Sequence, residues 1–214
     1  MLDIARAPLL RRQQGDIVSV ARRLAGRGDV LRRVWLLLTD VAAQEIEGKL
    51  EQVHNECARA VERLAQDLAA LRQVERALGR RRDISEPVAI ARDVPAELRD
   101  LAQSLRQDCL VLESDDETRA AAGQRVTSRR RPAREGRDNY PDCEILESCF
   151  RFADRLGGSS FRPGIWFVSS NSSDFGRHDR QNELHSEFAA HGVRYVGNVA
   201  WAFSEATDAP SLQA

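Results

Sequence analysis

Residues 165–175 read IWFVSSNSSDF, an apolar run followed by a polar stretch. The apolar run is short and contains β-branched and aromatic side chains, so it predicts a strand buried on both faces. Residues 193–196 (VRYV) predict another strand, and residues 183–190 predict an intervening helix that ends before Gly192. Helices alternating with short strands are typical of a parallel sheet with crossover helices.

The same alternation extends toward the N-terminus. Asp142 opens a predicted helix whose apolar residues recur at helical spacing and which stops at residues 157–158, two glycines. Residues 34–38 (VWLLL) predict a further strand buried on both faces, and residues 4–25 predict a helix before it. The fold class expected from this pattern is α/β.

The middle of the chain predicts two helices. The first runs from about residue 40 to residue 78, with apolar residues at steps of three and four. The second begins near Pro95, and its apolar face reaches through Cys109 to Leu112. Two amphipathic helices joined by a linker predict an antiparallel hairpin. An intermolecular coiled coil is the alternative.

Composition excludes several classes of protein. The chain has 214 residues, 42% of them hydrophobic and 30% charged, which is enough for a core. Its formal net charge of −1 gives no global attraction to nucleic acid, so RNA binding requires a local basic patch. The four cysteines form no CxxC pair, and the sequence has no apolar stretch long enough for a signal peptide or a membrane span. Both observations predict a cytoplasmic protein. No G-x-S-x-G elbow supports a serine nucleophile.

Three carboxylates follow strands or open helices at the edge where α/β proteins bind ligands. Glu45 lies early in the helix after residues 34–38, Asp174 follows residues 165–168, and Asp142 opens the helix before that strand. Taken singly, each side chain has a structural explanation, such as solvation or, for Asp142, capping its own helix. Their predicted convergence at one edge indicates a site.

Two segments resemble a known family. Residues 131–147 (RPAREGRDNYPDCEILE), and residues 167–175 followed by residues 183–187 (ELHSE), resemble the larger bacterial PIN-like nucleases that carry a helical insertion. The resemblance implies a three-layer α/β/α PIN-like sandwich with a parallel sheet, formed by a single domain over residues 1–214. The antiparallel helical hairpin, residues 43–112 approximately, would be the insertion. The implied activity is metal-dependent endoribonuclease hydrolysis of single-stranded RNA with Mg²⁺ or Mn²⁺.

The resemblance also implies roles for individual residues. Glu45, Asp142 and Asp174 match the catalytic, metal-binding acids of the family, and Glu47 is a weaker substitute for Glu45 because it points about 200° around the helix. The expected supporting residues are Asn171, Glu147 and Ser170.

Carboxylates suit this chemistry because Mg²⁺ prefers oxygen ligands and keeps several waters, so two or three acids suffice. A bound metal can activate water for attack on phosphorus. The expected RNA-binding residues are Arg129, Arg130, Arg131, Arg134 and Arg137, whose backbone contacts would be salt-sensitive. The alternative for this segment is a solvated loop paired with Glu135 and Asp138.

One part of the family pattern has no counterpart. PIN-like domains begin with a central strand that ends in a metal-binding Asp, whereas residues 1–6 resemble the segment just after that strand. We therefore expect the N-terminal strand to be missing, through a start assigned too late or a genuine loss, and the chain as written to be poorly soluble or inactive. Extension upstream would restore the strand. If the loss is genuine, the alternative is a non-catalytic PIN-like remnant that binds RNA or a protein partner, or self-associates, through its helical hairpin.

Overall fold

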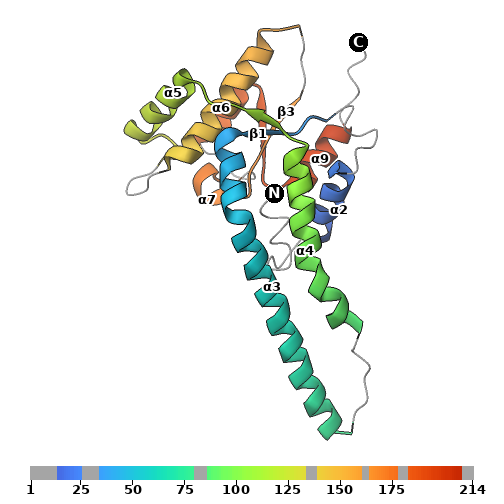
Figure 1. The fold of residues 1–214 in the computed structure, drawn as a ribbon. Coiled ribbons are helices and arrows are strands. Elements are labelled where there is room, and N and C mark those ends of the chain that lie inside the picture. Colours follow the sequence, from blue (N-terminus) through green and yellow to red (C-terminus); the bar gives the residue numbers. More distant parts are fainter. Residues whose placement is uncertain are drawn as a thin grey trace. The chain divides into compact units, whose positions relative to one another are not determined.

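The computed structural model describes residues 14–25, 34–79, 86–133, 139–160, 164–177 and 183–208 (Figure 1). The chain divides into two compact units, one formed by residues 1–28 and 45–108 and the other by residues 29–44 and 109–214. Within the described residues, the helices are too short or too polar to cross a membrane. Residues 1–6, to which the expected loss of the family's first strand refers, and the start of the predicted helix 4–25 lie outside the described residues.

The first unit is helical. Its elements are α2 (Gln14–Ala25), α3 (Asp40–Ala77) and α4 (Glu86–Gln107). Only the part of α3 from residue 45 onward belongs to this unit. Figure 1 shows α3 and α4 side by side and running in opposite directions. Their contact is made by Val53 and Ala102, with Leu50 packed against them, and His54 Nδ1 lies 3.3 Å from the carbonyl of Pro95. The apolar contact of Leu50 and Val53 on α3 with Ala102 on α4 therefore holds the two helices together.

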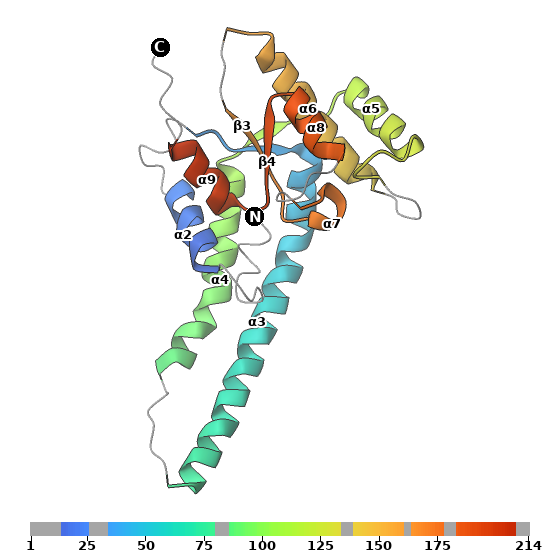
Figure 2. The same ribbon diagram turned by 180° about the vertical axis from the view of Figure 1, so that it is seen from behind.

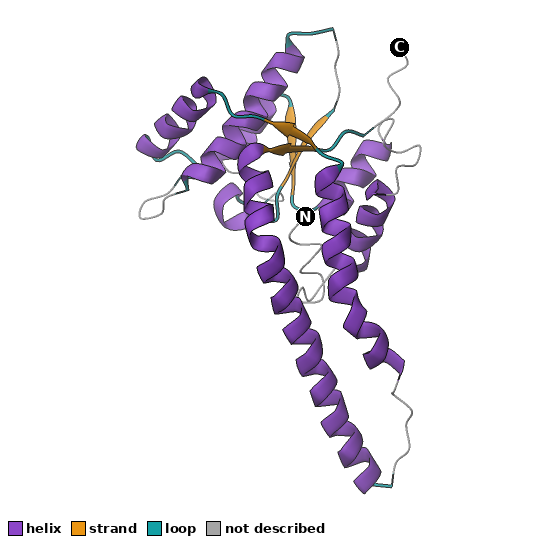
Figure 3. Ribbon diagram, in the orientation of Figure 1, coloured by secondary structure: helices purple, strands orange, loops and turns teal. Residues whose placement is uncertain are grey.

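The second unit is a mixed α/β structure with short parallel strands. Its elements are β1 (Leu37–Thr39), β2 (Leu110–Leu112), α5 (Asp116–Thr127), α6 (Tyr140–Gly157), β3 (Ile165–Val168), α7 (Ser172–Phe175), α8 (Glu183–Ala190), β4 (Val193–Val196) and α9 (Val199–Asp208). In the described residues, β1 pairs with β2 and β3 pairs with β4, both in parallel (Figure 3).

The core of the second unit lies where α6 and α8 meet β3 (Figure 2). The ring of Phe188 on α8 packs edge-on against Phe150 of α6, with centroids 5.3 Å apart. Phe167 of β3 lies 5.3 Å from the same ring. Leu146 and Leu184 are fully buried beside them. These apolar contacts fix the position of β3, and with it the loop that follows the strand.

Several predictions from the sequence are confirmed. The strands at residues 165–168 and 193–196 and the helix at residues 183–190 have the predicted bounds. Helix α6 ends at Gly157, as the glycine pair indicates. The long middle helix also has its predicted extent, residues 40–77.

The predicted end of the second middle helix is wrong. Helix α4 stops at Gln107, so Cys109 and Leu112 do not belong to it, and it begins at Glu86 instead of near Pro95. Residues 110–112 form β2, because Leu110 N donates to the carbonyl of Leu36 and the strand pairs with β1. Pairing with a distant strand overrides the helical spacing of these apolar residues.

The predicted strand at residues 34–38 is also partly wrong. Strand β1 begins at Leu37, and Trp35 is 65% exposed, so this run is not buried on both faces. Helix α5 has no counterpart among the helices predicted from the sequence. Its signal is Asp115, which caps the helix by accepting a hydrogen bond from Thr118 N at 2.8 Å.

A buried arginine joins the helices of the second unit. Arg125 on α5 is 3% exposed. Its Nε donates to Glu147 on α6 at 2.6 Å and its Nη2 donates to Glu187 on α8 at 2.7 Å. Its Nη1 donates to the carbonyl of Arg131 at 2.6 Å. One guanidinium therefore ties together three helices and the segment after α5.

We predict that Arg125→Met destabilises the protein strongly. The substitution removes the buried partner of Glu147 and leaves Glu187 with the exposed Arg130 alone, which costs about 3 kcal/mol or more. Arg130→Met is the matched control, because Arg130 contacts Glu187 at 3.1 Å but is 58% exposed. Its cost should be below about 1 kcal/mol. Urea denaturation measures both, and similar losses for the two variants would contradict the role given to Arg125.

We also predict acid sensitivity from Glu187. Burial raises the pKa of Glu187, but hydrogen bonds and charge from Arg125 and Arg130 outweigh burial and hold that pKa below its ordinary value of 4.5. The stabilisation is therefore complete above pH 4.5 and is lost as the pH falls through the lowered pKa. Denaturation between pH 7 and pH 3 should show a smaller loss of unfolding free energy in Glu187→Gln than in the unmodified chain. Equal losses would refute the assignment.

Candidate functional site

The loop after β3 turns back on itself and buries an acid. Asn171 caps the short helix α7, and its side-chain oxygen accepts a hydrogen bond from Asp174 N at 3.3 Å. Helix α7 is a single turn, so the chain reverses directly beyond the strand. As a result Asp174 is only 6% exposed, although it follows a strand end where acids are commonly solvated.

Two side-chain amides and a hydroxyl contact the carboxylate of Asp174. Asn139 Nδ2 donates to Oδ1 at 3.0 Å, and Asn171 Nδ2 donates to Oδ2 at 2.9 Å. Ser173 Oγ lies 3.2 Å from the same Oδ2. Burial of a carboxylate is tolerated only with such hydrogen bonds. These donors fix the orientation of the group.

The start of α6 is joined to this loop. Asn139 precedes the helix and forms no side-chain cap, because its amide donates to Asp174 and, at 2.8 Å, to the carbonyl of Pro132. Asp142 lies in the first turn of α6 and is half-buried. The alternative that Asp142 itself caps the helix is wrong, because the cap position belongs to Asn139. A carboxylate in the first turn of a helix is nevertheless stabilised by the helix dipole.

Glu45 belongs to the first unit, on α3. Its side chain is 45% exposed and forms an ion pair with Lys49, one turn further along the helix. Glu47 is also exposed and accepts a hydrogen bond from Arg106 on α4 at 2.6 Å.

The expected supporting residues differ in what they contact. Asn171 contacts Asp174 directly. Ser170 has an exposed side chain, and its carbonyl accepts a hydrogen bond from Ser172 N at 2.8 Å, so it shapes the turn. Glu147 accepts its hydrogen bond from Arg125.

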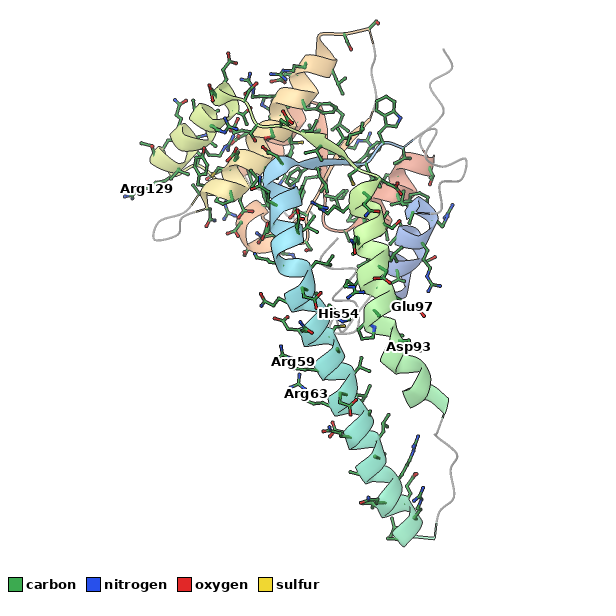
Figure 4. The ribbon with its side chains drawn as sticks, in the orientation of Figure 1. His54, Arg59, Arg63, Asp93, Glu97 and Arg129 are labelled. Atoms are coloured by element: carbon green, nitrogen blue, oxygen red, sulfur yellow. The ribbon has the colours of Figure 1, made fainter. Side chains whose placement is uncertain are left out.

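The arginines after α5 have separate environments. Arg129 lies at the end of α5, is exposed and adopts a positive φ of 53° (Figure 4). Arg130 is exposed and pairs with Glu187, whereas Arg131 is half-buried and its carbonyl accepts from Arg125. Arg134 and Arg137, together with residues 135 and 138, lie outside the described residues.

A tyrosine contacts both ends of the loop that carries Asp174, residues 169–176. Tyr195 on β4 donates its hydroxyl to the carbonyl of Gly176 at 2.8 Å and lies 3.3 Å from the carbonyl of Ser169. Burial raises the pKa of Tyr195, so the phenol keeps the proton it donates. Both ends of the loop, residues 169 and 176, are thereby held to the neighbouring strand.

A second polar cluster lies beyond the carboxyl ends of β1 and β2. Asp40 Oδ1 accepts from Ser114 Oγ at 3.0 Å, and Asp40 Oδ2 accepts from Ser114 N at 3.2 Å. Ser114 Oγ in turn lies 3.3 Å from Ser148 Oγ on α6. Burial raises the pKa of Asp40, but the hydrogen bonds from Ser114 and Val41 outweigh burial and keep the pKa below its ordinary value. The cluster connects the first turn of α3 to β2 and α6.

Sequence reasoning did not single out Asn139, Tyr195 or Asp40. Asn139 carried a weak signal, because asparagine before Tyr140-Pro141 is typical of a helix start. Its contact with Asp174 spans 35 positions in the sequence and has no local signal. The role of Tyr195 likewise depends on the pairing of β4 with β3.

The carboxylate of Asp174 suits a hard cation that keeps most of its water ligands. The described part of the chain contains no group of three or more histidine, cysteine, aspartate or glutamate side chains arranged to hold a metal ion. Mg²⁺, however, is commonly bound through one or two carboxylates together with water and substrate phosphates. A carboxylate whose orientation is fixed by amides, as in Asp174, fits that mode of binding.

Comparison with known proteins identifies the family. Searches of curated proteins and of solved structures give no significant match. The family model described as PIN domain matches residues 8–175, which is more than half of the chain and includes both Asp142 and Asp174. The chain therefore belongs to the PIN domain family.

Proposed function

We propose that this protein is a metal-dependent endoribonuclease that hydrolyses phosphodiester bonds of single-stranded RNA with Mg²⁺ or Mn²⁺. The catalytic and metal-binding acids in this proposal are Glu45, Asp142 and Asp174. The observation that carries it is the burial of Asp174 beyond β3, with its carboxylate held by Asn139 and Asn171. Membership of the PIN domain family supports a nuclease-type fold.

Burial of the Asp174 carboxylate costs free energy. An ionised carboxylate loses hydration when it is buried, and hydrogen bonds from neutral amides recover only part of that loss. The same three donors make the group rigid. Pre-organised carboxylates of this kind are characteristic of sites that bind a cation, because fixed ligands lose little freedom on binding.

The metal, when bound, would supply a nucleophilic hydroxide and neutralise charge on the phosphodiester oxygens. Asp142 and Asp174 would supply carboxylate oxygens from α6 and from the loop after β3, and Glu45 would supply another from α3. Asn139 and Asn171 would hold Asp174 in place. Ser170 would support the site by shaping the turn, and Glu147 by holding Arg125.

Arginines would contact the RNA backbone. Arg129 and Arg130 are neighbouring exposed residues after α5. Because the net charge of the chain is −1, RNA binding requires a local positive patch, and these two arginines would provide it. Arg131, Arg134 and Arg137 extend the proposed RNA-binding segment. Because exposed phosphate contacts are screened by salt, this binding would weaken as ionic strength rises.

The proposed fold is the three-layer α/β/α PIN sandwich, in one domain with the helices of residues 43–112 as its inserted hairpin. The parallel pairing of the short strands and the opposite directions of α3 and α4 support it. The four cysteines form no disulfide, which supports the proposal of a reducing, cytoplasmic location.

We predict that Asp174→Asn and Asp142→Asn each weaken Mn²⁺ binding and lower the rate of RNA cleavage at least ~100-fold, because each removes a charged ligand worth several kcal/mol. Isothermal titration with Mn²⁺ measures binding, and a fluorogenic single-stranded RNA in Mn²⁺ or Mg²⁺ measures cleavage, with each variant compared in the given chain and in the chain extended upstream. Asp116→Asn is the matched control, since the side chain of Asp116 is 100% exposed. It should change neither quantity. Cleavage that survives Asp174→Asn would refute the proposal.

A second function is favoured if the folded chain neither binds Mn²⁺ nor cleaves RNA. The protein would then be a non-catalytic PIN-domain remnant that acts through its long helices. The supporting observation is a row of exposed apolar side chains on α3, spaced seven and three residues apart: Leu64, Leu71 and Val74, which are 55%, 50% and 55% exposed. Leu78, just beyond the end of the helix, is 65% exposed. Such a row on one helix face is typical of a helix that binds another helix.

For this second function we predict that the chain self-associates and that Leu71→Glu abolishes the association, because the charge would be buried in the contact. Sedimentation equilibrium measures the molecular mass. Gln73→Glu is the control, because Gln73 is exposed on another face of the same helix. A monomeric unmodified chain at all concentrations would exclude self-association.

A further inference from the structure

The ring of Tyr195 on β4 is held by the aromatic core of the second unit. It stacks on Phe188 of α8, with centroids 5.3 Å apart and an angle of 13° between the planes. Phe167 of β3 lies 6.1 Å from the same ring, and His185 packs edge-on against it at 6.0 Å. A ring enclosed by such neighbours has few orientations available, because close-packed side chains keep to one rotamer. The hydroxyl of Tyr195 therefore has a fixed position.

This hydroxyl contacts both ends of the loop at residues 169–176. It donates to the carbonyl of Gly176 at 2.8 Å, and it lies 3.3 Å from the carbonyl of Ser169. Ser169 N also donates to the carbonyl of Val196 at 3.2 Å, so β4 holds the first end of the loop at two points. Gly176 is buried and adopts a φ of 83°, a conformation that favours glycine. The chain therefore turns sharply where the hydroxyl contacts the second end of the loop.

The contacts of the Asp174 loop differ in what they hold. Two of the donors to the Asp174 carboxylate, Asn171 and Ser173, belong to the loop itself. Contacts of this kind shape the loop but move with it, so they do not fix its place in the second unit. Asn139 at the start of α6 and Tyr195 on β4 contact the loop from outside. Asn139 holds the carboxylate, whereas Tyr195 holds the backbone on either side of it.

We propose that Tyr195 is a positioning residue for the metal site, which raises the affinity for Mn²⁺ or Mg²⁺ by fixing the two ends of the Asp174 loop. The proposal rests on the proposed function, in which Asp174 is a metal-binding acid. A residue that orients a metal ligand contributes to metal affinity, because a ligand that is fixed before binding loses little freedom on binding. The hydroxyl of Tyr195 is engaged with backbone carbonyls, so Tyr195 acts through the loop and not by contact with the metal or the RNA.

Tyr195→Phe tests this role, because it removes the hydroxyl and keeps the ring. Isothermal titration with Mn²⁺ compares the variant with the unmodified protein, in the given chain and in the chain extended upstream. We expect the dissociation constant for Mn²⁺ to rise about tenfold, the lower end of the range for residues that orient metal ligands. Tyr140→Phe is the matched control, because the hydroxyl of Tyr140 contacts the carbonyl of Arg119 on α5, at 3.3 Å. It should leave the Mn²⁺ affinity unchanged.

Two further measurements separate positioning from a contribution to stability alone. In RNA cleavage, Tyr195→Phe should need about tenfold more Mn²⁺ to reach half of its maximal rate, while its rate at saturating Mn²⁺ stays near that of the unmodified protein. A tyrosine that only stabilised the fold would leave the half-saturating Mn²⁺ concentration unchanged in a folded variant, and urea denaturation verifies that the variant is folded. In the absence of metal, the backbone amides of residues 169–176 should exchange hydrogen faster in Tyr195→Phe than in Tyr140→Phe.

Each outcome decides the role of Tyr195. Unchanged Mn²⁺ affinity in a folded Tyr195→Phe variant, or an equal loss in Tyr140→Phe, overturns the role and leaves the nuclease proposal standing. Loop amides that exchange no faster in Tyr195→Phe overturn it as well, because the hydroxyl would then not hold the loop. If the unmodified protein binds no Mn²⁺ in either form of the chain, the proposed function and the role of Tyr195 fail together.

Discussion

The side-chain amide of Asn139 holds together the parts of the second unit that carry its acids. It donates to Asp174 in the loop after β3 and to the carbonyl of Pro132 in the segment after α5, while its own backbone begins α6. An amide has two N–H donors in a fixed plane, so both contacts are satisfied by a single orientation. Replacement of either partner would release the loop, the segment or the start of α6, and the position of Asp142 in the first turn of α6 depends on the same contact.

The buried charged groups of the second unit are held in two ways. The guanidinium of Arg125 pairs with Glu147 and Glu187, so its charge is compensated between α5, α6 and α8. The carboxylate of Asp174 is oriented by the side-chain amides of Asn139 and Asn171. A carboxylate whose orientation is fixed in this way loses little freedom when it binds a cation.

The sequence predicts the local parts of this structure well and the long-range parts poorly. The strand at residues 165–168, the following turn and the helix α8 have local signals, because apolar runs, serine-rich turns and glycine stops act over a few residues. Residues 110–112 look like a continuation of α4 until β1 is available as a partner. The contacts of Asn139, Arg125 and Tyr195 each join segments distant in sequence, so composition and spacing could not reveal them.

Helix α8 connects the aromatic core of the second unit to its buried arginine. Glu187 accepts a hydrogen bond from Arg125 at 2.7 Å and pairs with Arg130 at 3.1 Å. Phe188, the next residue of the helix, packs against Phe150 of α6 and Phe167 of β3. Because neighbouring residues of one short helix make both sets of contacts, the core that positions β3, and with it the Asp174 loop, also positions Arg125 and the exposed Arg130 after α5.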